Sequence, residues 1–184
     1  MATGDDDLKV SLAWSLATVF FTAISFALGY AVNGYGGLYA ASLSHGIQWV
    51  CCVLHAFPCQ TEMYYDLTGS LTYMSIAIFT LLYTIAPQES RGWIAPHPRQ
   101  IVASGLLILW AARLGCFLFF RIRKDKQDKR FTNIKPYFVA YFGTWTIQGT
   151  WVFVTGLSVW AVNQREPSTQ PRLGWLDVLG ISIW

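Results

Sequence analysis

Hydrophobic positions in this chain fall into long unbroken blocks, not into the alternating patterns of soluble helices and strands. From Val10 to Thr61 there is no acidic or basic side chain, apart from His45 and His55. Crossing the ~30 Å hydrocarbon core of a bilayer takes about 20 apolar residues. A soluble domain of 184 residues cannot bury a block of this length, so the pattern predicts membrane helices.

Breaks between the blocks predict an all-α fold: a polytopic transmembrane helix bundle with about five full spans and a partial sixth. Asn33–Gly37 is a turn, since asparagine and glycine tolerate positive φ, and Pro58 ends the second span. The expected spans are Val10–Val32, Leu38–Phe57, Gly69–Ala86, Gln100–Phe120 and Tyr137–Asn163, with Leu173–Trp184 beginning a sixth and Pro87–Arg99 forming a loop. Residues 1–184 form one domain. The acidic leader Asp5–Asp7 and a long apolar core argue against a signal peptide.

Composition agrees with this prediction. Hydrophobic residues make up 54% of the chain and charged residues 12%, whereas soluble domains are about one quarter charged. The four cysteines have neither disulfide nor zinc spacing, so no metal site is expected. The net charge is only +3, and nucleic acid is not an expected partner.

The distribution of basic residues orients the spans. Seven of the thirteen lie between Arg121 and Lys135, and cytoplasmic loops carry an excess of Lys and Arg. The interpretation is a cytosolic Arg121–Lys135 loop, which also places the N-terminus and the loop around Glu62 in the cytosol. The bilayer is the one certain partner; no protein partner is predicted.

Arg113 is left inside the fourth span. With Phe117 and Arg121 it shares one helix face at four-residue spacing, near Trp110. This ladder can hold an anionic ligand at the cytosolic mouth, because intramembrane charges usually face a polar cavity. Equally, Arg113 can snorkel to the headgroups. The basic loop after it can grip phosphates, contact anionic lipid or only set topology.

Two further clusters have alternative interpretations. A polar stripe follows the second span at intervals of three and four residues: His45, Gln48, Cys52, His55 and Cys59. It is expected to pack against neighbouring helices or line a cavity, with metal binding the less favoured alternative. The segment around Glu62, Tyr65 and Asp66 concentrates acids and phenols at the membrane edge. It can supply a catalytic proton if burial raises a carboxylate pKa, or it can be a solvated turn.

Four segments occur in an order and spacing that resemble a known family. They are Tyr64–Tyr73, Leu109–Gly115 (Leu-Trp-Ala-Ala-Arg-Leu-Gly), Asp128–Phe131 (Asp-Lys-Arg-Phe) and Trp175–Trp184. Together they resemble an uncharacterised family of multispanning proteins allied to the steroid 5-alpha-reductase C-terminal domain, over roughly residues 60–184. The better-known relatives are helical membrane bundles that use NADPH to reduce conjugated double bonds in sterols and lipids.

The resemblance implies a membrane-bound NADPH-dependent reductase of a lipid or sterol-like substrate, and it implies the endoplasmic reticulum as the membrane. On this view Glu62, Tyr65 and Asp66 are the catalytic residues, with Tyr65 or Glu62 donating the proton. Arg113, Arg121, Asp128 and Arg130 are cofactor-binding residues.

The chain also departs from the family pattern. Relatives continue past the equivalent of Trp184 with an Arg-His-Pro-Asn-Tyr segment that supplies much of the cofactor pocket. A truncated, inactive reductase is therefore expected for the 184-residue chain, with a last segment too short to span and no basic residue nearby in sequence to pair with Asp177. The alternative is a non-enzymatic membrane protein, either an assembly partner or a small-molecule carrier.

Overall fold

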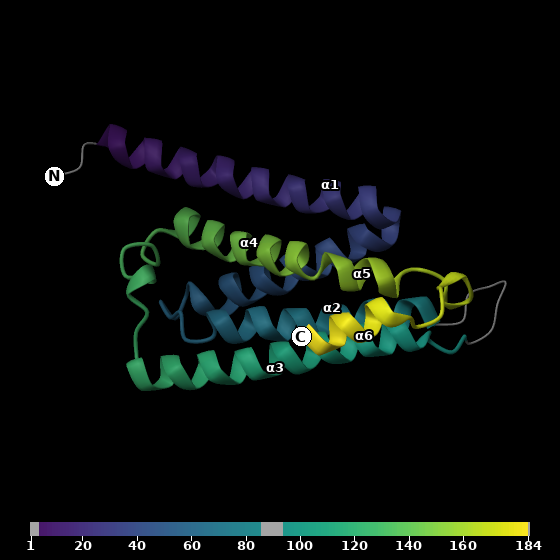
Figure 1. The fold of residues 1–184 in the computed structure, drawn as a ribbon. Helices are drawn as coiled ribbons and strands as arrows, with labels where there is room; N and C mark the ends of the chain where they lie inside the picture. The colour runs from purple at the N-terminus through teal and green to yellow at the C-terminus, as the bar shows by residue number, and fades with distance from the viewer. Residues whose placement is uncertain (1–3, 86–93, 184) are drawn as a thin grey trace.

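A computed structural model describes residues 4–85 and 94–183, with the side chains of residues 7–83 and 94–183. Most of these residues are helical, and no strand occurs among them, so the predicted all-α class is confirmed. The six α-helices lie roughly side by side as a bundle (Figure 1). Most of the predicted loop at residues 87–99 falls on residues 86–93, which lie outside the described ranges.

Helix α1 (Gly4–Cys51) is a hairpin of two helical arms. It breaks where the sequence predicted a turn: Gly34 has φ 57° and ψ −133°, a conformation that only glycine adopts readily. The arms then cross so closely that a Cβ added to Gly37 would overlap the backbone carbonyl of Gly29. Glycines at both positions are what allow the two backbones to touch.

The second arm continues as a π-helical segment, η1 (Cys52–Ala56), with the Phe57 amide donating to the Cys52 carbonyl five residues earlier. This wider turn shifts the phase of the polar stripe. His45, Gln48 and Cys52 are buried, as expected for a packing stripe, whereas His55 and Cys59 are exposed. The prediction of one continuous stripe therefore fails at η1, because the π turn adds a residue to the helical period.

Helices α2 (Tyr65–Ile85) and α3 (Pro98–Asp125) pack through small side chains. The buried face of α3 carries Ser104, Ala111 and Gly115. A Cβ on Gly115 would lie 2.7 Å from the Cβ of Ser70 on α2. In the Leu109–Gly115 motif, Ala111 and Gly115 are thus the contact surface, and the arginine between them points elsewhere.

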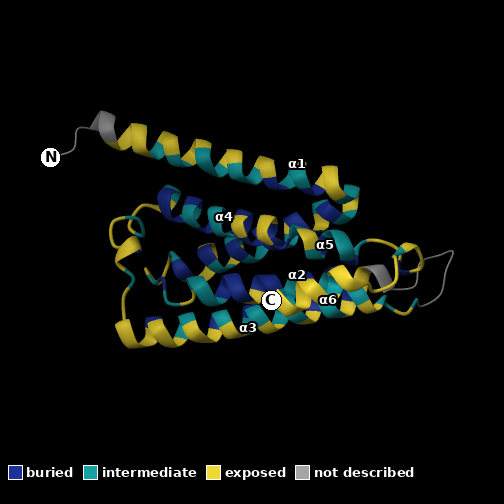
Figure 2. Cartoon of the chain, in the orientation of Figure 1, coloured by how far each residue is buried: buried dark blue, intermediate teal, exposed yellow. Residues whose placement is uncertain are grey.

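Helices α4 (Phe138–Thr155) and α5 (Leu157–Asn163) correspond to the fifth predicted span. That span was expected to be continuous, but it breaks at Gly156, where any Cβ would overlap the indole of Trp160. The Trp160 Nε1–H donates to the Phe153 carbonyl (3.0 Å), which satisfies a carbonyl next to the break. Most of the buried residues of the bundle lie on α4 and its neighbours (Figure 2).

A polar network ties the other end of the bundle together. The buried Asn163 side chain donates to the hydroxyls of Thr80 (3.0 Å) and Ser104 (2.9 Å). Gln100 Nε2 donates to the carbonyls of Asn163 and Arg165, both at 2.9 Å, so it caps the end of α5. These contacts link α2, α3 and α5.

The last helix, α6 (Trp175–Ile183), is held at its beginning by Asp177. This carboxylate accepts from Arg99 Nε (2.8 Å) and Nη2 (2.7 Å) and from the Gly174 amide (2.8 Å). No basic partner was expected near Asp177 in sequence. The partner that the fold supplies, Arg99, lies 78 residues away in sequence, at the start of α3. The remainder of the described part of α6 is mostly exposed (Figure 2).

Two described helical stretches, Asp7–Ala56 and Pro98–Asp125, are long and apolar enough to cross a membrane. Neither is the buried core of a soluble domain, since large apolar side chains such as Leu12, Leu16 and Phe117 are more than half exposed. The fold also places the beginning of α1, the loop around Glu62 and the basic loop at one end of the bundle (Figure 1).

Candidate functional site

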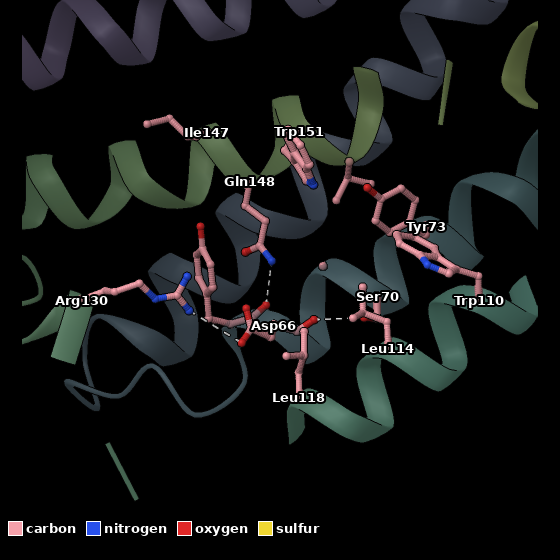
Figure 3. A pocket seen from close by; sticks show the side chains of 13 residues that line it. Asp66, Ser70, Tyr73, Trp110, Leu114, Leu118, Arg130, Ile147, Gln148 and Trp151 are labelled. Carbon is pink, nitrogen blue, oxygen red and sulfur yellow. Dashed lines mark hydrogen bonds and ion pairs between the residues drawn. The ribbon is translucent and has the colours of Figure 1, made fainter. Parts of the chain in front are cut away.

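A cavity of about 300 Å³, called the inner cavity here, lies among α2, α3 and α4 at the end of the bundle that carries the basic loop. Its volume is at the lower limit of small-ligand pockets. Its walls are mostly apolar and aromatic, and its two charged side chains, Asp66 and Arg130, lie together at one end, called the polar end here (Figure 3). The lining residues are Tyr65, Asp66, Gly69, Ser70, Tyr73, Trp110, Leu114, Leu118, Arg130, Ile147, Gln148, Trp151 and Val152.

At the polar end, two arginines approach one carboxylate oxygen. Asp66 Oδ2 is 3.4 Å from Arg121 Nη2 and 3.9 Å from Arg130 Nη2. Arg121 comes from the last turns of α3, and Arg130 from η2 (Lys129–Phe131) in the basic loop. Asp66 thus lies close to two arginines that are 55 and 64 positions away from it in sequence, at the polar end of the inner cavity.

Asp66 supplies the carboxyl group at this end of the cavity, and its pKa is raised. It lies in the first turn of α2, before the apolar stretch that begins at Gly69. Burial raises the pKa of its carboxyl group, and the positive charges of Arg130 and Arg121 only partly offset that effect. A carboxyl group in this setting holds a proton more readily than one in water.

Glu62 has the opposite environment. Its carboxylate pairs with Lys135 Nζ (2.9 Å) and accepts from the Asp128 amide (3.0 Å). Burial alone would raise its pKa, but these hydrogen bonds outweigh it and hold the pKa below the usual range. Glu62 is therefore ionised at neutral pH, and it fastens the basic loop to the segment before α2.

The Tyr65 ring is packed edge-on against Phe131 and Trp145, with ring centroids 4.8 and 5.0 Å away. Its hydroxyl donates to the Thr144 carbonyl at 3.0 Å. Burial raises its pKa well above that of a free phenol. In this geometry the Tyr65 side chain holds α2 against α4 and also forms part of the cavity wall.

Only part of the ladder of Arg113, Phe117 and Arg121 that the sequence predicted on α3 contributes to the site. Arg121 reaches Asp66 and Trp110 lines the inner cavity, but Arg113 and Phe117 are exposed and line neither cavity described here. The four-residue spacing is real, yet Ala111 and Gly115 turn their own face inward and leave Arg113 on the outside. Asp128 pairs with Arg130, whose Nε lies 3.0 and 2.9 Å from the two carboxylate oxygens.

A second hollow, the loop cavity, lies beside the first and measures about 510 Å³. It is lined by Arg121, Ile122, Asp125, Gln127, Asp128, Lys129 and Arg130. Arg130 belongs to the walls of both cavities. Guanidinium and ammonium groups are the usual protein partners of phosphate, although two acidic side chains here are interspersed with the three basic ones.

Several lining residues escaped the sequence interpretation. Gln148 projects from α4 and donates to the Tyr65 carbonyl at 3.0 Å, into space that exists because residue 69 is glycine. Tyr73 meets Trp110 edge-on at 5.3 Å. A single glutamine inside an apolar span was the available signal for Gln148, since polar side chains in membrane helices usually face the bundle interior.

The Glu62–Lys135 pair gives a testable pH dependence. Because the folded-state pKa of Glu62 is lowered, its stabilisation is fully present above the unfolded pKa of about 4.3 and is lost as the pH falls through the folded pKa. We expect Glu62→Gln to lower stability at pH 7 by about 2 kcal/mol, with the difference from wild type shrinking as the pH falls below the unfolded pKa of about 4.3. Thermal unfolding in detergent measures it, and Asp125→Asn is the control. A constant difference across this range would contradict the assignment.

One known protein family matches most of the chain. The model of one family, described as "Protein of unknown function (DUF1295)", matches residues 45–184. The chain belongs to this family. The match takes in the latter part of the second arm of α1 and every helix after it, and hence all residues that line the inner and loop cavities. No curated protein and no solved structure matches the chain.

Proposed function

We propose that the chain is a polytopic membrane protein with five antiparallel spans. The two arms of α1, α2, α3 and the α4–α5 pair each have enough residues to cross a bilayer, since 21 residues in α2 extend about 32 Å. The polar residues of α4 face protein, not lipid, which explains a span of moderate hydrophobicity. The end with the Arg121–Lys135 loop would face the cytosol.

Within this bundle, we propose an NADPH-dependent reductase that acts on a conjugated double bond of a lipid or sterol-like molecule. The observation that supports it is the inner cavity, with aromatic and aliphatic walls for an apolar substrate and one proton-holding carboxyl group at its polar end. The resemblance to steroid 5-alpha-reductase relatives supplies the reaction type. The apolar walls exclude water from the reacting part of the substrate.

The loop cavity fits the phosphate groups of the cofactor. Arg121, Lys129 and Arg130 would hold them, because these side chains supply several N–H donors in one hollow. NADPH would supply the hydride when bound. Asp128 keeps the Arg130 guanidinium in position by accepting from its Nε and from its Nη2 (2.5 Å), so a phosphate oxygen would be bound by the remaining N–H groups.

In this proposal Asp66 holds the proton, and its neighbours have different tasks. Glu62 is ion-paired and ionised, so it anchors the loop. The Tyr65 hydroxyl is already donated to a backbone carbonyl, so it fixes the position of α2. The Asp66 carboxyl group lines the cavity and would hold a proton at Oδ1 for transfer to the substrate, because Oδ2 accepts from Arg121.

The test is NADPH binding to the full protein in lipid nanodiscs, measured by calorimetry. We expect Arg121→Gln and Arg130→Gln each to weaken binding about tenfold, while the exposed Arg123→Gln leaves it unchanged. Asp66→Asn should leave NADPH affinity intact but reduce NADPH oxidation with 4-cholesten-3-one by at least a hundredfold. Absence of NADPH binding to the folded protein would refute the reductase proposal.

A carrier without enzymatic activity is the second candidate, and one feature favours it. Of the basic side chains at this end, Lys135 pairs with Glu62 and Arg130 pairs with Asp128, so part of the positive charge is already neutralised within the chain. The same titration separates the two functions, because a carrier would take up the lipid without binding NADPH.

A further inference from the structure

A third cavity, called the arm cavity here, lies between the beginning of α1 and the segment that leads into α4. Its volume is about 500 Å³, within the range of small-ligand pockets. One wall comes from α1, and the other comes from Phe57 and the segment 133–140. Among the described residues, none lines both the arm cavity and either of the other two cavities. The arm cavity is therefore separate from the sites proposed for the cofactor and the reducible substrate.

The wall on α1 is a single helix face. Asp7, Val10, Ser11 and Trp14 follow one another at intervals of three, one and three residues, which places them on the same side of the helix. This side faces α4, and the two helices touch at Trp14, where a Cβ added to Gly143 would lie 2.8 Å from Trp14 Cε3. From that contact the cavity extends to Asp7, about 10 Å along the helix. Figure 1 shows the first arm of α1 running beside α4.

Polar side chains line the outer end of the arm cavity, where α1 begins. Asp7 and Asn133 are exposed there, and Tyr137, the residue before α4, is 64% exposed. Within the part of the chain that the structure describes, these three side chains have no hydrogen bond or ion pair. A carboxylate, a side-chain amide and a phenol hydroxyl are thus available to a ligand at this end.

The charge at this end is negative. Asp7 is the one charged side chain among the described residues that line the arm cavity. Lys135 belongs to the same segment as the second wall, but its ammonium group turns to Glu62, 2.9 Å away, and does not line the cavity. A cationic head group would therefore be attracted to Asp7, and an anionic one would be repelled.

Aromatic and aliphatic side chains form the rest of the walls. Trp14 lies on the α1 side, and Phe57 and Phe138 meet edge-on at 4.9 Å on the other. Aromatic rings attract ammonium groups through their faces, and they also bury hydrocarbon. The cavity thus offers an anionic, hydrogen-bonding end and an apolar remainder, which is the pattern that an amphipathic cation requires.

We propose that the arm cavity binds a single-chain lipid with an ammonium head group, which lies beside Asp7 while its hydrocarbon chain lies against Trp14, Phe57 and Phe138. This site goes beyond the proposed reductase function, since it shares neither residues nor ligand with it. The α1 wall also lies outside residues 45–184, which the family model matches. The site therefore depends on the N-terminal arm of this chain.

The experiment titrates hexadecylamine and hexadecanol into the full chain in dodecyl maltoside at pH 7, by calorimetry, without NADPH and with empty micelles as blank. The two probes share a chain and differ in head-group charge, because an alkyl ammonium titrates near the pKa of lysine, about 10.4. We expect the amine to bind at least about fivefold more tightly than the alcohol. Palmitate should bind more weakly than either, because Asp7 repels its carboxylate. These comparisons do not depend on any variant folding.

Asp7→Asn is the decisive variant. It should bring the amine to within about twofold of the alcohol and leave the affinity for the alcohol unchanged. Asp125→Asn is the matched control, because it removes another exposed acid at the same end of the bundle, and it should preserve the preference. Val10→Trp, at a half-exposed position of the α1 wall, should fill the cavity and abolish saturable binding of both probes.

A free long-chain amine and the choline head group of a bilayer lipid share this chemistry, and competition distinguishes them. Displacement of hexadecylamine by lysophosphatidylcholine would assign the site to bilayer phospholipids, whereas persistence of the bound amine would assign it to free amines. A hexadecylamine analogue with a photoreactive diazirine in its chain should label residues 7–14 or 133–140, as read by peptide mass spectrometry.

Equal affinities for the amine and the alcohol would overturn the proposal. Equal losses of preference in Asp7→Asn and Asp125→Asn would do the same, because they would reduce the effect to the general surface charge of this end. Labelling confined to the walls of the inner cavity would also contradict it. None of these readouts involves NADPH, so the result is independent of the reductase test.

Discussion

Replacing Gly37 with alanine is expected to unfold the N-terminal hairpin of α1. A Cβ at this position would overlap the Gly29 carbonyl oxygen, which is backbone and cannot turn aside as a flexible side chain can. The two arms must separate, and the packing of the first arm is disturbed with them. We expect a loss of at least about 3 kcal/mol, at the upper end of single-substitution effects.

Gly46 provides the matched control, because it lies on the same arm with no heavy atom within 4 Å of its Cβ position. Gly46→Ala should be neutral or stabilising by about 0.5–1 kcal/mol, since alanine favours the helix. Unfolding in dodecyl maltoside, followed by tryptophan fluorescence, measures both variants. Equal stability of the two variants would show that the arms do not cross at Gly29 and Gly37.

Asn163→Ala is expected to cost about 2–4 kcal/mol. The side chain is fully buried and bonds to Thr80 and Ser104, and it also accepts from the Ser104 hydroxyl at 3.1 Å. Alanine leaves the Ser104 hydroxyl without that partner and opens a small void where α2, α3 and α5 meet.

A double-mutant cycle separates this network from simple loss of volume. Ser104→Ala in the Asn163→Ala background should cost much less than in wild type, because the shared hydrogen bonds are already gone. Exposed Ser182, whose hydroxyl bonds within α6, serves as the serine control. Strictly additive costs would mean that the two side chains do not act as a unit.

Local signals in the sequence were enough to predict most helix boundaries. The Asn-Gly pair at residues 33 and 34 forms the break in α1, and α2 and α3 cover the predicted third and fourth spans. Each of these features depends on nearby residues with strong conformational preferences. The break at Gly156 gave no such signal, because this glycine stands alone in an apolar run and acts through its contact with Trp160.

The sequence indicated which types of side chain form the candidate site, but it did not indicate how the fold arranges them. Acids before α2 and basic residues after α3 were identified from composition, and the fold brings Asp66, Arg121 and Arg130 together. Which carboxyl group has a raised pKa depends on long-range partners: Lys135 lowers the pKa of Glu62, while burial raises that of Asp66 because its arginine partners offset the effect only partly. Spacing placed Arg113 and Arg121 on one face but could not show that Ala111 and Gly115 turn the opposite face inward.

The indole of Trp160 determines how α4 and α5 can move. A helix break within a bilayer usually serves as a hinge only if water or another group replaces the lost hydrogen bonds as it opens. Here Trp160 Nε1 binds the Phe153 carbonyl from within α5 itself. Swinging α5 away would remove this donor and leave the carbonyl in hydrocarbon. The bend at Gly156 is therefore expected to keep its angle. A displacement of α4 beside the inner cavity would then move α5 and the Asn163 network together with α4.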